Sequence, residues 1–291
     1  MLHPITDTFA IYRDDVYPYL GGGNKARKMM ALDHFIKSNG YNAIVTTGAI
    51  QSNHCRAVAI YCKKNNIACA LVLHGGEDNF YSQGGNAKII RSSDSKLIFS
   101  QPIDISKKMD KAMSDYNIKG LKPYYLVGSG HTLEGGKAYI DVVKDIASSD
   151  FIPDYIFLAS GSGSTQAGIL AGLSKYNVQS KVIGISVGRK KSIIENDIKR
   201  FYGKLCDEYQ IPKTYNEFVV TDDFLCQGYD KYNPEIKTIS ENSLTKYGVI
   251  LDTTYTAKAF YGMEQIILKN NLSSKKILFW YTGGIYNYFA K

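Results

Sequence analysis

Short apolar runs and helix-like patterns alternate along this chain, separated by polar, glycine-rich turns. The apolar runs predict strands at 8–13, 43–47, 68–73, 124–127, 155–159, 182–187 and 277–281. Between them apolar residues recur at helical spacing, as over 27–37, whereas 74–120 is the least regular segment. Strand, polar turn, helix, strand is the pattern of a parallel sheet with helices packed on it. The pattern therefore predicts an α/β protein.

Loops rich in Gly, Ser, Thr, Asn or His follow several of the predicted strands. They are 48–54, 128–132, 160–165 and 282–284. Ligands of parallel sheets bind at the carboxyl ends of the strands. We therefore expect these loops to converge on one crevice, as in an enzyme.

Composition narrows the functional class. The 291 residues are enough for one large domain or two ordinary ones, and 44% of them are hydrophobic. No apolar run approaches the ~20 residues that span a bilayer and no targeting segment opens the chain, so a cytoplasmic protein without membrane contact is expected. The net charge of +8 comes from scattered lysines, which does not indicate a nucleic-acid partner. Five cysteines without a C-x-x-C pair predict neither a metal site nor disulfides.

A run of three glycines, 21–23, and an asparagine precede Lys25 at the start of a predicted helix. Glycine adopts positive φ and lets the backbone approach a ligand closely. A lysine held on such a turn and partly desolvated has a lowered pKa, which makes its amine a nucleophile. A solvated basic turn is the alternative for this stretch alone.

The loop 160–165 lies between a predicted strand and a helix, where N–H groups and the helix dipole favour a phosphate. It lacks the Walker lysine, and Gln166 stands at the third glycine position of a dinucleotide fingerprint. One phosphate is therefore the simpler interpretation, and a tight turn without a ligand is the alternative. A single phosphate site together with a reactive lysine indicates pyridoxal phosphate (PLP), held by Lys25 as a Schiff base.

Six motifs carry a wider resemblance: 12–15, 22–28, 47–54, 161–168, 251–259 and 282–284. In this order they resemble the 1-aminocyclopropane-1-carboxylate (ACC) deaminase and D-cysteine desulfhydrase family, within the tryptophan-synthase-β-like (fold type II) PLP enzymes. The resemblance implies two three-layer α/β domains with open, mostly parallel sheets and the cofactor in the cleft between them. Residues 1–28 and 135–291 would form the large PLP-binding domain and 29–134 a small inserted one. A homodimer is also implied.

The resemblance assigns roles to individual residues. It implies catalytic roles for Lys25, Ser52, Tyr229 and Tyr255, cofactor contacts for Lys25, Asn53, Gly161, Ser162, Gly163, Ser164, Thr165 and Thr282, and substrate contacts for Ser52, Asn53 and His54. Lys25 would be the base at the substrate α-carbon, Asn53 would bind the ring hydroxyl oxygen, and Ser52 would lie by the substrate carboxylate. The alternative for His54 is that it only orients its loop. His131 stands where relatives usually carry asparagine, so no role is assigned to it.

Two threonines distinguish the branches of the family. Thr256 and Thr282 stand where the cyclopropane deaminases carry glutamate and leucine. The Ser-Asn-His of 52–54 also resembles the desulfhydrases, whereas 163–168 resembles the deaminases. A glutamate would keep the ring nitrogen protonated, as opening a cyclopropane requires. A neutral hydroxyl makes a weaker electron sink, sufficient when a β-leaving group departs as the α-proton is taken.

We therefore predict a PLP-dependent lyase that converts a small D-amino acid such as D-cysteine to pyruvate, ammonia and sulfide by α,β-elimination. ACC deaminase is the first alternative. A specialised biosynthetic relative acting on another amino acid is the second, because only 24 residues precede Lys25, fewer than is usual in the family. A non-catalytic PLP-binding protein and a basic nucleic-acid-binding module are the remaining classes.

Overall fold

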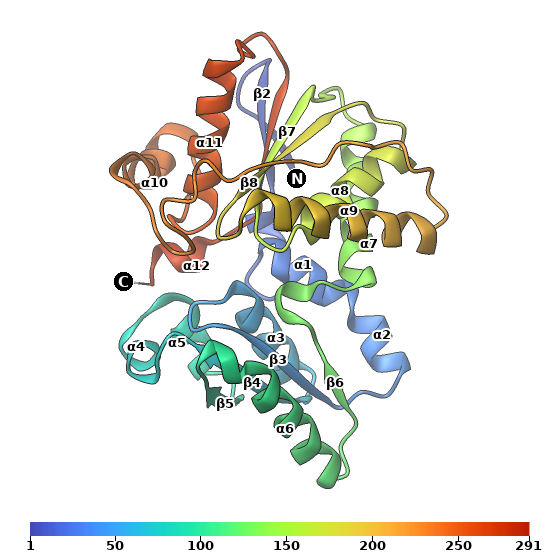
Figure 1. The fold of residues 1–291 in the computed structure, drawn as a ribbon, viewed down its shortest axis with the longest axis vertical. Coiled ribbons are helices and arrows are strands. Elements are labelled where there is room, and N and C mark those ends of the chain that lie inside the picture. Colours follow the sequence, from blue (N-terminus) through green and yellow to red (C-terminus); the bar gives the residue numbers. More distant parts are fainter. Residues whose placement is uncertain (291) are drawn as a thin grey trace. The chain divides into compact units, whose positions relative to one another are not determined.

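Residues 1–290 of the chain are described by a computed structural model, shown in Figure 1, and they divide into two compact units. Unit 1 comprises Met1–Tyr17 and Leu133–Ile285. Unit 2 comprises Pro18–Thr132 and the C-terminal segment from Tyr286. Each unit has its own sheet, so each is described by itself.

The sheet of unit 1 has six strands in the order β1-β2-β10-β7-β8-β9, and only β1 is antiparallel to its neighbour. The strands are β1 (Leu2–Pro4), β2 (Phe9–Arg13), β7 (Tyr155–Ser160), β8 (Lys181–Ser186), β9 (Val219–Thr221) and β10 (Ile277–Tyr281). Leu278 and Trp280 of β10 face one apolar core, and Ile277, Phe279 and Tyr281 face another. A strand buried on both faces is apolar throughout, which explains the unbroken run of β10.

Helices cover both faces of this sheet. One face packs on α7 (Leu133–Ala147), α8 (Ser164–Lys175) and α9 (Lys191–Glu208), and the other on α10 (Pro234–Tyr247) and α11 (Thr256–Lys269), as Figure 1 shows. The short η1 (Asp14–Val16) follows β2. Glycines let α7 and α8 pack closely, since a Cβ on Gly168 would lie 2.6 Å from the carbonyl oxygen of Gly136. No helix within residues 1–290 is long and apolar enough to cross a membrane.

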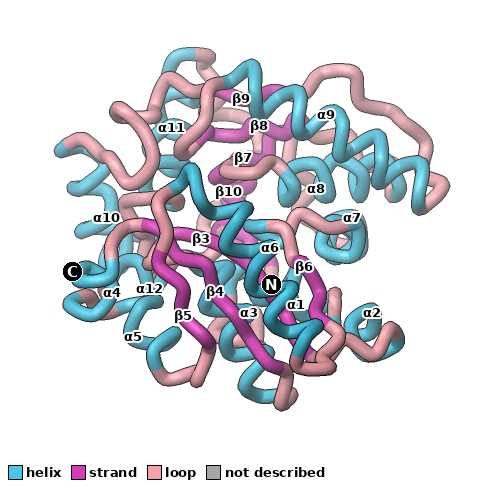
Figure 2. Tube along the Cα trace, turned by 60° about the horizontal axis from the view of Figure 1, so that its bottom comes forward, coloured by secondary structure: helices cyan, strands magenta, loops and turns pink. Residues whose placement is uncertain are grey.

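Unit 2 contains a parallel sheet of four strands in the order β5-β4-β3-β6, drawn in magenta in Figure 2. Its strands are β3 (Ala43–Ala49), β4 (Ala68–His74), β5 (Lys96–Phe99) and β6 (Pro123–Tyr125). Its helices are α1 (Gly23–Ala31), α2 (Asp33–Ser38), α3 (Asn53–Lys64), α4 (Glu77–Ser82), α5 (Gly85–Arg91), η2 (Pro102–Asp104), α6 (Ile105–Ile118) and η3 (Gly128–Gly130). The helix α12 (Ile285–Tyr288) begins at the last residue of unit 1 and continues into unit 2. Met109 and Tyr116 of α6 pack on one face of the sheet, against Val45 and Val72.

The α/β prediction is confirmed, and every predicted strand is present with small shifts at its ends. The irregular segment 74–120 contains β5 and α6, which the pattern did not predict. The helix predicted over 27–37 begins earlier, at Gly23, and ends at Ala31, with α2 following after Leu32. Residues 18–28 belong to unit 2 because α1 packs on α3. The compact unit therefore does not have the limits 29–134, and that domain assignment stays a prediction.

Candidate functional site

Lys25 lies in the first turn of α1, after a left-handed segment of backbone. Leu20, Gly21, Gly22 and Gly23 have φ of 51°, 77°, 71° and 83°. Such values cost a residue with a side chain about 1 kcal/mol, so three of the four positions are glycine. The Lys25 Nζ donates to the carbonyl oxygen of Ser129 at 3.2 Å. Burial lowers the pKa of Lys25 to about 8, so about a tenth of this amine is uncharged at pH 7, far more than for an ordinary lysine.

Arg56 holds the left-handed turn in place. This side chain of α3 is 2% exposed, and its guanidinium donates to three successive carbonyl oxygens: Leu20 at 3.1 Å, Gly21 at 2.7 Å and Gly22 at 3.0 Å. The guanidinium carbon lies 4.7 Å from the centre of the Tyr286 ring. Burial lowers the pKa of Arg56 to about 10, which still leaves it charged near neutral pH. Sequence reasoning missed Arg56, because a basic residue on a helix carries no signal of what it binds.

Ser52 and His54 both belong to the loop-to-helix junction after β3. The Ser52 Oγ accepts from the backbone N–H of Cys55 at 3.1 Å and caps α3, so its own proton remains available for donation. The His54 Nε2 lies 2.9 Å from the Thr46 Oγ1, which itself donates to the Leu126 carbonyl oxygen at 2.8 Å. The proton of the ring therefore sits on Nε2.

His54 is uncharged near neutral pH. Burial, and then the charges of Lys25 and Lys28, lower its pKa to about 3. A Cβ on Gly130 would lie 3.8 Å from the His54 Nδ1, so the ring packs near the turn that contains Ser129, the acceptor of Lys25. This geometry fits the orienting role for His54. The predicted substrate contact of His54 stays a prediction.

Asn53 is oriented by an amide network within unit 2. Its Nδ2 donates to the Asn287 Oδ1 at 2.6 Å, and its Oδ1 accepts from the Asn86 Nδ2 at 3.0 Å. Asn86 and Asn287 also donate to the carbonyl oxygen of Gln51, at 3.1 Å and 3.0 Å. Asn86 and Asn287 lie far from Asn53 in sequence, so local pattern could not identify them. The network leaves the second Nδ2 proton of Asn53 for another acceptor.

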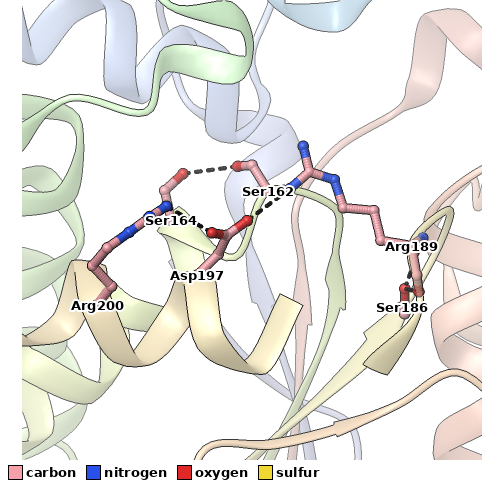
Figure 3. Close-up of polar contacts among 6 residues, drawn as sticks. All are labelled: Ser162, Ser164, Ser186, Arg189, Asp197 and Arg200. Atoms are coloured by element: carbon pink, nitrogen blue, oxygen red, sulfur yellow. Dashed lines mark hydrogen bonds and ion pairs between the residues drawn. The ribbon is translucent and has the colours of Figure 1, made fainter. Parts of the chain in front are cut away.

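In unit 1, the predicted phosphate loop joins β7 to α8. Gly163 has a φ of +77°, and a Cβ there would overlap Ile198 of α9, so this position requires glycine. A Cβ on Gly161 would meet only the Val187 Cγ2, at 3.7 Å. The Ser162 and Ser164 hydroxyl oxygens lie 3.1 Å apart and point toward each other in Figure 3. The first turn of a helix presents N–H groups and a positive dipole end, which suits a phosphate.

Two arginines near this loop share one carboxylate, as Figure 3 shows. Asp197 of α9 accepts from Arg189 at 3.0 Å and from Arg200 at 2.7 Å. The Ser186 hydroxyl donates to the Arg189 carbonyl oxygen at 2.6 Å and thereby shapes the turn after β8. Arg189, Arg200 and Asp197 together carry one net positive charge, which favours an anionic group beside them.

Tyr229 and Tyr255 meet within unit 1. Their hydroxyl groups are hydrogen-bonded to each other, and the ring centres lie 5.7 Å apart at an interplanar angle of 74°. Burial, and then Tyr229, raise the pKa of Tyr255 well above its ordinary value. Both predicted tyrosines are therefore in one place, and the Tyr255 phenol keeps its proton near neutral pH.

Asp252 binds the hydroxyl of Thr256, so the hydroxyls of Thr256 and Thr282 differ in their hydrogen bonding. This buried carboxylate accepts from the Thr254, Tyr255 and Thr256 N–H groups at 3.0 to 3.1 Å and from the Thr256 hydroxyl at 2.7 Å. The Thr256 Oγ1 also accepts from the Asp252 N–H, at 2.9 Å. Burial raises the pKa of Asp252 to about 6, against the lowering effect of these hydrogen bonds. The hydroxyl of Thr256 is therefore committed to Asp252.

Thr282 follows β10 and is 7% exposed. Its hydroxyl makes no hydrogen bond within the part of the chain that the structure describes. Taken by itself, each unit contains groups whose chemistry suits PLP: unit 2 has an amine of lowered pKa, and unit 1 has a phosphate-type turn and an uncommitted hydroxyl. The structure places the loops 48–54 and 128–132 in unit 2, and 160–165 and 282–284 in unit 1.

Comparison with known proteins also indicates pyridoxal phosphate chemistry. A family model described as "Pyridoxal-phosphate dependent enzyme" matches residues 8–283. A Pyrococcus horikoshii protein named "Putative 1-aminocyclopropane-1-carboxylate deaminase" is 33% identical over 94% of this chain and 84% of its own length. A "D-cysteine desulfhydrase" of Klebsiella pneumoniae is 27% identical over 96% of this chain and 88% of its own.

Solved structures of similar fold were also found, one of them at 30% sequence identity. The crystal structure of an "ACC deaminase homologue" superposes with a TM-score of 0.89 at 30% identity, covering 97% of this chain and 86% of that one. A hydrogen sulfide-producing enzyme of Fusobacterium nucleatum has a TM-score of 0.64 at 15% identity, over 97% of this chain and 92% of its own, which shows a shared fold alone.

Proposed function

Because this chain belongs to the family of pyridoxal-phosphate dependent enzymes, within its ACC deaminase and D-cysteine desulfhydrase-like group, we propose that it eliminates the β-substituent of a small D-amino acid. With D-cysteine and water the products are pyruvate, ammonia and hydrogen sulfide. Two findings support the proposal: membership of this family, and the different hydrogen bonding of the Thr256 and Thr282 hydroxyls.

We propose the following residues for the cofactor. Lys25 binds its aldehyde carbon, the loop 161–165 binds its phosphate, Asn53 donates to its ring hydroxyl oxygen, and Thr282 meets its ring nitrogen. When bound, PLP accepts the electron pair that is released at the substrate α-carbon. The lowered pKa of Lys25, about 8, supports its role because the amine must be uncharged to react.

The chain's own groups then move protons. Once the substrate amine has replaced it on the aldehyde carbon, the Lys25 Nζ is a free amine and takes the proton from the α-carbon, while the Ser52 hydroxyl donates to the substrate carboxylate. The bond between the β-carbon and sulfur breaks, sulfur leaves with the electron pair, and the Tyr229–Tyr255 pair supplies a proton to it. The remaining three-carbon enamine reacts with water to give pyruvate and ammonia. Burial raises the pKa of Tyr255, so its phenol holds a proton near neutral pH, and the hydrogen bond to Tyr229 keeps the two hydroxyl groups together.

The observation that carries the choice of reaction is the commitment of Thr256 to Asp252 and the free hydroxyl of Thr282. A neutral hydroxyl at the ring nitrogen supports elimination, which needs only a weak electron sink. ACC deaminase is the second candidate. The name of the Pyrococcus horikoshii relative and the resemblance of 163–168 to the deaminases favour it.

Product identification tests the proposal. PLP-loaded protein is given D-cysteine, 3-chloro-D-alanine, L-cysteine and ACC in parallel, with pyruvate, 2-oxobutyrate and sulfide measured. Pyruvate from both D-substrates is expected. Release of 2-oxobutyrate from ACC without pyruvate from D-cysteine would establish the second candidate instead. Borohydride trapping with peptide mapping should label Lys25, and a K25A variant with an exposed-site control, K37A, separates this lysine from the others.

We also propose that the protein is a homodimer, as the resemblance implies, and that it is cytoplasmic, as expected from its sequence. Light scattering after gel filtration tests the dimer: a dimer should have twice the 32.4 kDa mass of one chain, and a mass of 32.4 kDa would show a monomer.

A further inference from the structure

Lys258 is a buried cation whose only described hydrogen-bond partners are backbone carbonyls. It lies on α11, three residues after Tyr255, and its side chain is 0% exposed. The Nζ donates to the carbonyl oxygens of Leu225 at 3.0 Å, Gly228 at 3.1 Å and Val187 at 3.4 Å. No carboxylate forms an ion pair with it in residues 1–290. Burying a cation is costly, so a cation that binds only carbonyls indicates a specific positioning task.

The segment that Lys258 holds has an unusual backbone. Cys226, Gln227, Gly228 and Asp230 have φ of 51°, 72°, 134° and 59°. Three of these four are not glycine, and each non-glycine residue in this region costs about 1 kcal/mol or more. Surrounding contacts must therefore stabilise the segment 225–230. Besides Lys258, they include the Thr254 hydroxyl, which donates to the Asp230 Oδ1 at 2.6 Å.

Tyr229 stands within this segment, and Lys258 joins the elements around it. The Tyr229 ring rests on Gly188, where a Cβ would lie 3.2 Å from the Tyr229 Cβ. Gly188 directly follows Val187, one of the Lys258 acceptors, and Gly228 precedes Tyr229. The Tyr229 hydroxyl is bonded to Tyr255. One ammonium thus ties the end of β8, the 225–230 segment and α11 together.

We propose that Lys258 is a positioning residue that acts through Tyr229, by keeping the 225–230 segment in the conformation that places its hydroxyl against Tyr255. This rests on the proposed function, in which the tyrosine pair supplies a proton to the leaving group. Lys258 itself touches no reacting atom. Its loss acts on proton delivery and leaves binding of the cofactor through Lys25 intact.

Hydrogen–deuterium exchange tests the tether without any catalysis. K258M keeps the length of the side chain and removes the donors, while K269M changes an exposed lysine of the same helix. Peptides that cover 225–230 should exchange at least about tenfold faster in K258M, the effect of losing roughly 1.4 kcal/mol of local stability. They should be unchanged in K269M. Equal exchange in K258M and wild type overturns the proposal.

A double-mutant cycle tests whether Lys258 acts through Tyr229. We expect K258M to lower kcat about tenfold, with PLP absorbance and affinity unchanged. In the Y229F background, K258M should have almost no further effect on kcat. If the losses of K258M and Y229F multiply, Lys258 acts by another route and the proposal is wrong.

A K258R variant keeps the charge and the donors, so it should recover part of the activity and slow exchange again. It also replaces K258M if that variant fails to fold. The two proposals fail separately. If the wild-type protein releases no keto acid from any amino acid tested, the proposed function is wrong, and the exchange of 225–230 still decides whether Lys258 holds the segment.

Discussion

Replacing Lys25 by methionine should change the stability of the cofactor-free protein with a sign that depends on pH. Burial lowers the pKa of Lys25 from 10.5 to about 8, and one pKa unit corresponds to about 1.4 kcal/mol. The charged form therefore costs the folded state about 3 kcal/mol, or about 2 after discounting for partial exposure of the side chain. The hydrogen bond to Ser129 returns about 1 kcal/mol.

The direction follows from proton binding. Below pH 8 both states carry a charged Lys25 and the folded state bears the full desolvation cost. Between pH 8 and 10.5 the unfolded state binds more protons, so wild-type stability rises with pH through that window. K25M should therefore be more stable than wild type by about 1 kcal/mol at pH 7 and less stable by about 1 kcal/mol near pH 10.5.

Urea denaturation of both proteins from pH 7 to 10.5 measures this difference. The exposed Lys37 of α2 provides the control, because K37M should differ from wild type by a nearly constant amount over the same range. A K25M difference that does not change with pH would refute the argument that Lys25 is desolvated.

Four further substitutions test the framework around the site. R56M should lower the free energy of unfolding by about 3 kcal/mol, because three carbonyls lose a charged donor; urea denaturation measures this loss. The same variant should loosen the turn before Lys25 and so raise the pKa of Lys25. Labelling of the amine at a series of pH values measures that pKa. G163A should cost about 2 kcal/mol or more through its φ of +77° and its overlap with Ile198, which thermal unfolding measures. T256V should destabilise by about 1–2 kcal/mol, whereas T282V should hardly change stability but should shift PLP absorbance and affinity.

Matched variants make these tests selective. K63M, on the exposed face of α3, controls for R56M, and equal losses from both would contradict the role of Arg56. G161A controls for G163A, because its Cβ would have ordinary contacts only, and it should keep wild-type stability. If T256V and T282V lose stability equally, the distinction between a committed and a free hydroxyl is wrong.

Local pattern was sufficient for much of this protein. The buried strands are continuous apolar runs because both faces of each parallel sheet are covered, so their positions could be read from the chain. The turn before Lys25 and the turn at 161–163 were also visible, since positive φ selects glycine wherever a side chain would clash. The order of these motifs was enough to indicate the family and its cofactor.

The groups that hold the site in shape came only from the tertiary structure. Arg56 binds carbonyls of residues 20–22, Asn86 and Asn287 orient Asn53, and Lys258 binds carbonyls of two other segments. These partners are backbone atoms or amides distant in sequence, and every residue carries a backbone carbonyl, so no spacing or residue type marks them in advance. The start of α1 at Gly23 has the same origin, because Arg56 holds the glycine turn in the left-handed conformation from which the helix begins. The sequence by itself determined most of the strands, the glycine turns and the position of the candidate lysine, whereas the contacts that orient these groups depend on distances that exist only in the folded chain.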